Sequence, residues 1–168
     1  MPETIVRMSF ANIGDYNRSN DGFMVTGRIV PKYANDEWTY SEEKFAEPYF
    51  KKYADEEIDF SYIEDADKVV FLGYDGIDCI GRIRLRANWN GFAMIEDIGI
   101  ANSHRRRGVG AALLAQATEW ARQNGYCGLM LETQDVNVSA CRFYASNGFA
   151  IGGVDTRLYA NFPTANEK

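Results

Sequence analysis

One stretch near the middle of the chain limits the possible folds more than any other: residues 98 to 111, Ile-Gly-Ile-Ala-Asn-Ser-His-Arg-Arg-Arg-Gly-Val-Gly-Ala. The apolar run over 92–101 predicts a strand. Apolar residues spaced three and four apart over 107–124 predict a helix, which Asn124-Gly125 would end. The turn from Arg105 to Gly110 therefore lies at a helix N-terminus. Its glycines let a ligand approach the backbone, and free N–H groups there favour an anion such as a pyrophosphate.

Two other interpretations of this turn are less specific. Gly-x-Gly is common in turns, and a run of arginines is usually a solvated loop or a nucleic-acid patch. No Lys-Ser/Thr follows Gly110, so the turn is not a Walker loop, and it lacks the third glycine of the dinucleotide fingerprint. The strand before it and the helix after it favour phosphate binding.

The remaining pattern predicts strands first and then alternating helices and strands. The expected strands are residues 22–33, 67–74, 77–86, 92–101, 127–134 and 149–159, and the expected helices are residues 42–54, 107–124 and 138–147. Asp75-Gly76 predicts a hairpin turn, and Pro48 would break or kink the first helix. We expect one α/β domain over residues 1–168, with a mixed sheet flanked by helices and residues 1–21 as a mobile lead-in.

Composition and charge argue against several classes of function. The chain has 168 residues and a net charge of −6, which suits one domain and argues against nucleic-acid binding. It carries neither a membrane-spanning apolar run nor a signal-peptide core, so we expect a cytoplasmic protein with no membrane partner. Cys79 and Cys127 read as buried reduced thiols, and the single histidine, His104, leaves no basis for a multi-histidine metal site. The acidic runs over 55–59 and 64–67 form either a solvated surface or a field that attracts a cation.

A second motif, Asn137-Val-Ser-Ala-Cys-Arg-Phe-Tyr-Ala-Ser-Asn-Gly-Phe149, follows the turn at a fixed distance. It matches the pattern Asn-x-x-Ala-x-x-Phe-Tyr-x-x-x-Gly-Phe, and Arg105 to Gly110 matches Arg/Gln-x-x-Gly-x-Gly/Ala. With both motifs, residues 67–160 resemble the GNAT superfamily of N-acetyltransferases. The resemblance implies the GNAT fold, acetyl-CoA as co-substrate and no metal. Relatives add a strand after a segment like Tyr159–Phe162; no apolar run remains here, so either that strand is absent or the sequence is shortened.

From about residue 23 the chain is similar to the streptothricin (nourseothricin) acetyltransferases. The similar segments include residues 29–33, 88–90, 95–98, 131–135 and 154–162. This resemblance implies antibiotic resistance by acetylation of an amine on the β-lysine arm of streptothricin, a cationic small molecule, by direct attack in a ternary complex. The alternatives are an acetyltransferase for peptide N-termini or polyamines, and a non-catalytic acetyl-CoA-binding regulatory domain. The sequence leaves open a homodimer.

The resemblance also assigns the donor site. Backbone groups of Ile98, Gly99 and Ile100 would pair with the pantetheine arm as an added strand does. Asn137 would hydrogen-bond the arm or simply cap its helix. Tyr144 would contact the donor and protonate the leaving thiolate, or it is a buried aromatic residue. The pyrophosphate would lie on the turn formed by Arg105, Arg106, Arg107, Gly108, Val109, Gly110 and Ala111.

The acceptor amine must lose a proton, and its site is expected among acidic and aromatic residues. Glu96 and Asp97 are adjacent on a strand, so they should point to opposite faces with only one facing the cleft. Glu96 is the candidate base, or else it attracts the cation without accepting a proton. Glu132 is a second acidic candidate. Aromatic walls for the cation would come from Trp89, Tyr33, Trp38 and Tyr40, which could equally be core residues.

Overall fold

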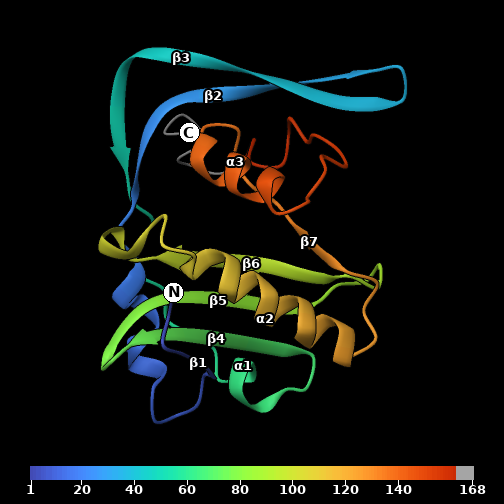
Figure 1. Ribbon diagram of the computed structural model, residues 1–168. Helices are drawn as coiled ribbons and strands as arrows, with labels where there is room; N and C mark the ends of the chain where they lie inside the picture. Colours follow the sequence, from blue (N-terminus) through green and yellow to red (C-terminus); the bar gives the residue numbers. More distant parts are fainter. Residues whose placement is uncertain (162–168) are drawn as a thin grey trace. The chain divides into compact units, whose positions relative to one another are not determined.

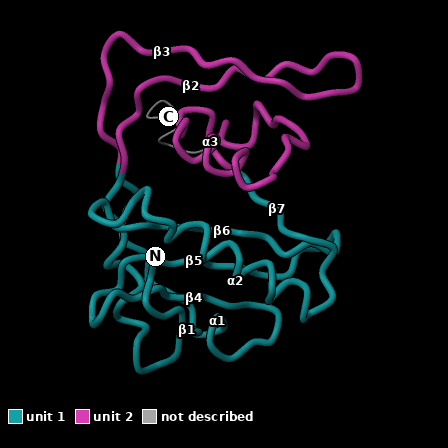
Figure 2. The backbone as a smooth tube through the Cα atoms, viewed as in Figure 1, with its two compact units in different colours: residues 1–22, 52–132 teal, residues 23–51, 133–168 magenta. Residues whose placement is uncertain are grey.

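The computed structural model describes residues 1–161, which form two compact units (Figures 1 and 2). Unit 1 comprises residues 1–22 and 52–132, and unit 2 comprises residues 23–51 together with the chain from residue 133. The chain thus leaves unit 1 to form one long hairpin, returns, and leaves it again after residue 132.

Unit 1 is built on a five-stranded mixed sheet in the order β1-β4-β5-β6-β7. Its strands are β1 (Thr4–Arg7), β4 (Lys68–Asp75), β5 (Asp78–Ala87), β6 (Ala93–Ile100) and β7 (Leu129–Leu131). Neighbours are antiparallel, except that β6 and β7 run parallel. The β4–β5 hairpin turns at Gly76, whose φ of +59° is the left-handed backbone that glycine adopts readily. The mixed sheet, this hairpin and strand β6 confirm the expectations from the sequence.

Helix α2 (Val109–Gln123) packs on one face of this sheet, as Figure 1 shows. Its buried stripe has the predicted spacing and consists of Val109, Leu113, Leu114, Ala117, Trp120 and Ala121. The approach to β5 is close: a Cβ at Gly81 would lie 2.9 Å from Val109 Cγ1. Glycine at this position therefore lets the helix that carries the phosphate turn seat directly on the sheet.

Residues 1–21 were expected to be a mobile lead-in, and the structure places a strand and a 3-10 helix in this segment, both packed in unit 1. Strand β1 pairs along its whole length with β4, and the 3-10 helix η1 (Ile13–Ser19) packs on β5. Tyr16, on η1, is fully buried in an apolar cluster with Met8 and Ile58. The sequence pattern gave no sign of this packing, because Tyr16 is a single aromatic residue among polar turn residues. The short helix α1 (Ser61–Glu64) packs against β4.

Unit 2 contains a long antiparallel hairpin, β2 (Phe23–Ala34) and β3 (Glu37–Lys51). The helix expected over 42–54 is therefore wrong, because cross-strand pairing with β2 overrides local helix propensity. Pro48 lies at the irregularity between the pairs Gly27↔Lys44 and Val25↔Tyr49, where a strand tolerates a residue without an N–H.

The expected helix at 138–147 is confirmed as α3 (Val138–Ser146), but the strand expected at 149–159 is not found among the described residues. Asp155 Oδ1 instead accepts the backbone N–H groups of Arg157 and Leu158 at 2.7 and 3.0 Å, which makes a turn. The sequence left open whether a last strand is absent or the sequence is shortened, and that question concerns residues from Phe162 onward, outside the described residues.

The cysteines only partly match their prediction. Cys79 and Cys141 are buried free thiols, whereas Cys127 is exposed because β7 begins two residues later than expected. Within residues 1–161 no cluster of three or more metal-ligating side chains occurs, and no helix is both long and apolar enough to span a bilayer.

Candidate functional site: a phosphate turn and an open strand edge

The predicted phosphate turn forms the N-terminus of α2 in unit 1. Gly108 caps the helix with a φ of +84°, and Arg106 also has positive φ. The Ala112 N–H donates to the Gly108 carbonyl at 3.0 Å, so the first helical bond begins there. The N–H groups of the three residues before Ala112 therefore point out of the helix end, where the helix dipole favours an anion.

Arg105 holds this turn in place rather than offering its charge outward. Its Nε donates to the Ile100 carbonyl at 3.0 Å and its Nη2 to the Gly22 carbonyl at 2.6 Å. Burial lowers the pKa of this guanidinium, against the opposing attraction of Asp21. The exposed arginines of the turn are Arg106 and Arg107, which leaves them as the side chains that can meet a phosphate.

Strand β6 has one edge open just before this turn. It pairs with β5 from Ala93 to Ile100, but with β7 over Ala93–Ile95 alone within the described chain. Beyond Ile95 the edge of β6 on the β7 side is thus not covered by that strand. An extended chain of amides can pair with such an edge. This geometry suits the role expected of Ile98, Gly99 and Ile100.

Glu96 and Asp97 do not point to opposite faces as expected. The register joins Arg84 to Asp97 and Leu85 to Ile95, so Glu96 is the extra residue of a β-bulge. A bulge interrupts strict alternation. Both carboxylates consequently lie over the same face of β5, where they meet arginines at positions 82, 84 and 86.

Each oxygen of the Glu96 carboxylate accepts a side-chain hydrogen bond. Arg86 Nε donates to Oε1 at 2.9 Å, and the Tyr62 hydroxyl donates to Oε2. Arg84 Nε lies 3.6 Å from the same Oε2. Burial of Tyr62 and this hydrogen bond raise the pKa of the Tyr62 phenol. Both Glu96 oxygens thus already face a hydrogen-bond donor, and these contacts favour the electrostatic interpretation of Glu96 over the general base.

The acidic run over 55–59 is anchored rather than free. Glu56 forms an ion pair with Arg84, Asp55 Oδ1 accepts a bond from Asn20 Nδ2 at 2.7 Å, and Asp59 accepts the Ser61 N–H at 2.8 Å. Part of the negative charge that could attract a cationic ligand is therefore balanced by neighbouring arginine and polar groups.

The expected aromatic and acidic acceptor residues lie in both units. In unit 1, Trp89 is 93% exposed in the turn between β5 and β6, and Glu132 is exposed just after β7. In unit 2, Tyr33 and Trp38 are register partners near the hairpin tip, with ring centroids 5.1 Å apart. Exposure shows that Trp89 is not a core residue.

Sequence reasoning missed the residues that surround the two carboxylates. These are Tyr16, Tyr62, Arg82, Arg84 and Arg86. The alternation Arg-x-Arg-x-Arg on a predicted strand was the available signal, because it places three like charges on one face that must find partners.

In unit 2 the second motif forms helix α3. Asn137 Oδ1 accepts the Ala140 N–H at 3.2 Å, which confirms the N-cap, and its amide Nδ2 is a separate donor. Tyr144 is 8% exposed, and its ring contacts those of Phe143 and Phe149. The tyrosine thus has a packing role, and its proposed acid role concerns the hydroxyl.

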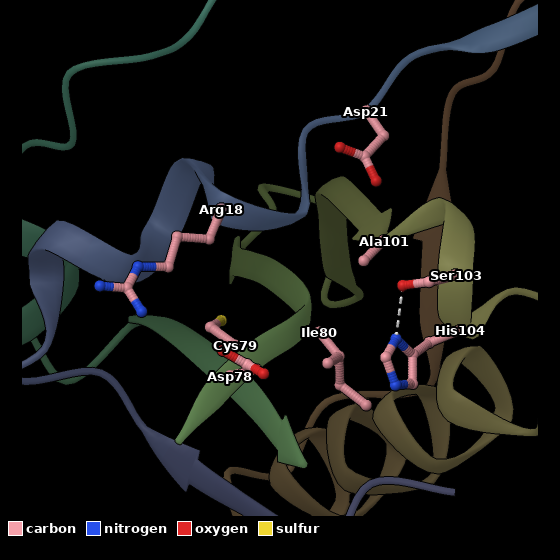
Figure 3. Close-up of a pocket in the computed structure, with 8 residues that line it drawn as sticks. All are labelled: Arg18, Asp21, Asp78, Cys79, Ile80, Ala101, Ser103 and His104. Atoms are coloured by element: carbon pink, nitrogen blue, oxygen red, sulfur yellow. Dashed lines mark hydrogen bonds between the residues drawn. The ribbon is translucent and has the colours of Figure 1, made fainter. Parts of the chain in front are cut away.

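An open cavity of about 400 Å³ lies in unit 1 beside the loop that follows β6 (Figure 3). Ser103 Oγ and His104 Nδ1 are 2.8 Å apart on its wall, and His104 Nε2 lies 3.2 Å from Asp75. Its lining contains none of the residues that the sequence assigned to the site; it consists of Arg18, Asp21, Asp78, Cys79, Ile80, Ala101, Ser103 and His104.

Comparison with known proteins identifies the family of this chain. The sequence profile of the acetyltransferase (GNAT) family matches residues 31–149, which include the phosphate turn and α3. The chain belongs to the GNAT acetyltransferase family. It is 56% identical to Streptothricin acetyltransferase A of Bacillus subtilis (strain 168), over 97% of this chain and 94% of that protein.

Solved structures agree with this assignment. A structure from Bacillus anthracis str. Ames, assigned to the streptothricin acetyltransferases and bound to acetyl coenzyme A, is 34% identical, with a TM-score of 0.89 over 96% of this chain and 92% of that one. Nourseothricin acetyltransferase is 28% identical, with a TM-score of 0.81 over 97% and 92%. This acetyltransferase therefore has the GNAT fold, as expected from its two motifs.

Proposed function

We propose that this acetyltransferase moves the acetyl group of acetyl-CoA to an amine on the β-lysine arm of streptothricin. The observation that carries the proposal is the 56% identity, across nearly the whole chain, to a protein named for this acceptor. The two superfamily motifs alone would fit any GNAT substrate. Identity over 97% of the chain also includes the segments outside the motifs, and this is why it supports a particular acceptor.

The donor would bind at the two features described in unit 1. The free N–H groups at the start of α2, with Arg106 and Arg107, suit a pyrophosphate. The open edge of β6 over Ile98–Ile100 suits the amides of a pantetheine arm. In unit 2, Asn137 Nδ2 would donate a further hydrogen bond to that arm.

In the reaction, the amine nitrogen would attack the thioester carbonyl carbon directly, with donor and acceptor bound together. A C–N bond forms and the C–S bond breaks, so the sulfur leaves as a thiolate that needs a proton. We assign that proton to the Tyr144 hydroxyl. The nitrogen releases one proton to solvent as the amide forms, and the Tyr144 hydroxyl regains one from solvent, which balances the exchange.

The amine must be neutral before it attacks, since an ammonium group has no lone pair. The pKa of a lysine-type amine in water is roughly 10.4, so little free amine exists at neutral pH. Because the Glu96 oxygens already accept bonds from Arg86 and Tyr62, we propose that the proton leaves to solvent and that Glu96 stabilises the cationic acceptor electrostatically. The acceptor's remaining contacts would come from Glu132, Trp89, Tyr33 and Trp38.

A steady-state assay with purified protein, acetyl-CoA and three acceptors tests the proposal. The acceptors are streptothricin, a short peptide with a free N-terminus and a polyamine, with release of the CoA thiol as the readout. We expect streptothricin to give the highest kcat/KM by orders of magnitude. A higher value for the peptide or the polyamine would remove the antibiotic assignment and keep the acetyltransferase, whereas acetyl-CoA binding without turnover on any acceptor would favour a regulatory domain.

A further inference from the structure

A buried guanidinium lies directly beneath the open edge of β6. Arg82 on β5 is 5% exposed. One face of its guanidinium lies 4.7 Å from the centre of the Tyr16 ring. On the β6 side, a Cβ built at Gly99 would lie 2.7 Å from Arg82 Nη1 and 2.9 Å from Cζ. Arg82 is therefore held between an aromatic ring and the β6 backbone, where only glycine leaves it room.

Asp97 fixes the guanidinium in this position. Its Oδ2 accepts bonds from Arg82 Nε at 2.5 Å and from the Tyr16 hydroxyl at 3.0 Å, and Ser19 Oγ accepts from Arg82 Nη1 at 3.3 Å. Burial disfavours the charged form of Arg82, but the electrostatic attraction and hydrogen bonds of Asp97 and Tyr16 together outweigh it and raise the Arg82 pKa. The buried Arg82 and the half-buried Asp97 thus join β5, β6 and η1.

This cluster lies at the part of β6 that is expected to bind the donor, so it bears on donor binding as well as on stability. Asp97 and Gly99 lie in the part of β6 that β7 does not pair with. A strand with a neighbour on one edge alone is positioned by that neighbour and by the groups on its faces. Here the face group is Arg82, which contacts the strand at both Asp97 and Gly99. Arg82 therefore fixes the position of the strand edge that is expected to bind the donor.

We propose that Arg82 and Asp97 are positioning residues for the donor-binding edge of β6, acting through Gly99, and that Asp97 is not an acceptor-binding group. The inference rests on the proposed use of this edge for acetyl-CoA. Neither residue touches the reacting atoms; each sets the position of the backbone groups at residues 98–100. Gly99 is required because a side chain there would displace the guanidinium, not because it would block the strand edge.

A double-mutant cycle on acetyl-CoA affinity, measured by calorimetry without any acceptor, tests the link. We expect Gly99→Ala to weaken binding about tenfold in the natural background and about twofold or less in Arg82→Ala, since coupled neighbours are non-additive. Equal losses in both backgrounds would overturn the proposal. Arg122→Ala, at an exposed pair with Glu119, serves as the control background and should give the full loss from Gly99→Ala.

Arg82→Lys gives the same test if Arg82→Ala does not fold. Lysine keeps the charge but lacks the planar fork that spans Asp97 and Gly99. We expect a higher KM for acetyl-CoA, an unchanged KM for streptothricin and an unchanged pH profile, with Asp97→Asn behaving alike. A raised streptothricin KM or an altered pH profile in Asp97→Asn would instead place Asp97 in the acceptor site. Because affinity is measured without acceptor, failure of the streptothricin assignment would leave this result standing.

Discussion

Glu96 Oε1 lies 2.9 Å from Arg86 Nε, so the carboxylate that the sequence predicted to face the cleft has a guanidinium partner. The contact exists because Glu96 is the bulged residue of β6 and its side chain turns over the arginine row of β5. A single extra residue in a strand thereby decides which side chains a carboxylate meets.

Glu96→Gln should lower kcat/KM for streptothricin by about tenfold at every pH between 6 and 9, because the substitution removes one interaction with a cation near the surface. The pH–rate profile should keep its shape, since the amine deprotonates to solvent. Glu119→Gln, at an exposed pair with Arg122, is the matched control and should retain the natural rate. A loss in Glu96→Gln that deepens as pH falls would restore Glu96 as the general base.

Gly108→Val should abolish detectable acetyl-CoA binding, because a β-branched residue cannot easily hold a φ of +84° and its side chain would stand at the phosphate turn. Gly125→Val provides the control at the other end of α2: its φ is +75°, and a Cβ there meets nothing within 4 Å. Both variants should lose about 1–2 kcal/mol of stability. Calorimetric affinity that is equal in the two variants would sink the phosphate-turn assignment.

Tyr144→Phe should reduce turnover by about a hundredfold or more while acetyl-CoA affinity stays nearly unchanged, since the hydroxyl alone is lost. The ring contacts with Phe143 and Phe149 remain, so the melting temperature should hardly move. Tyr126→Phe removes a hydroxyl from a tyrosine that packs on Trp120 and should leave turnover intact. A natural rate in Tyr144→Phe, with chemistry rate-limiting, would reduce Tyr144 to a packing residue.

Thiol modification of the native protein should be selective for Cys127. This cysteine is exposed, whereas burial raises the pKa of the Cys79 and Cys141 thiols and so lowers their thiolate fraction at neutral pH. Mass spectrometry after brief iodoacetamide treatment should show one modified site, and Cys127→Ser should remove it. Raising the pH should increase the labelling of Cys79 and Cys141 much less than that of Cys127, because both buried thiols are shielded from the reagent. Rapid labelling of Cys79 at neutral pH would contradict its buried position.

The sequence alone determined the elements whose cues are local. The turn before α2, the stripe from Val109 to Ala121 and the N-cap at Asn137 each depend on residues a few positions apart. The Asp75-Gly76 hairpin is similar, since the turn residues and the flanking strands specify it together. These features also carry the family resemblance, so the fold and the donor class could be predicted together.

Only the tertiary structure decided what depended on distant partners. Residues 42–51 form a strand because β2 pairs with them, and residues 13–19 pack on β5, where Tyr16 is buried. The bulge at Glu96 has no local signature, yet it sets which groups both carboxylates meet. A pairing register and a buried charge are properties of several segments at once. For this reason the sequence could name Glu96 and Asp97, while their partners, and therefore their chemistry, came from the fold.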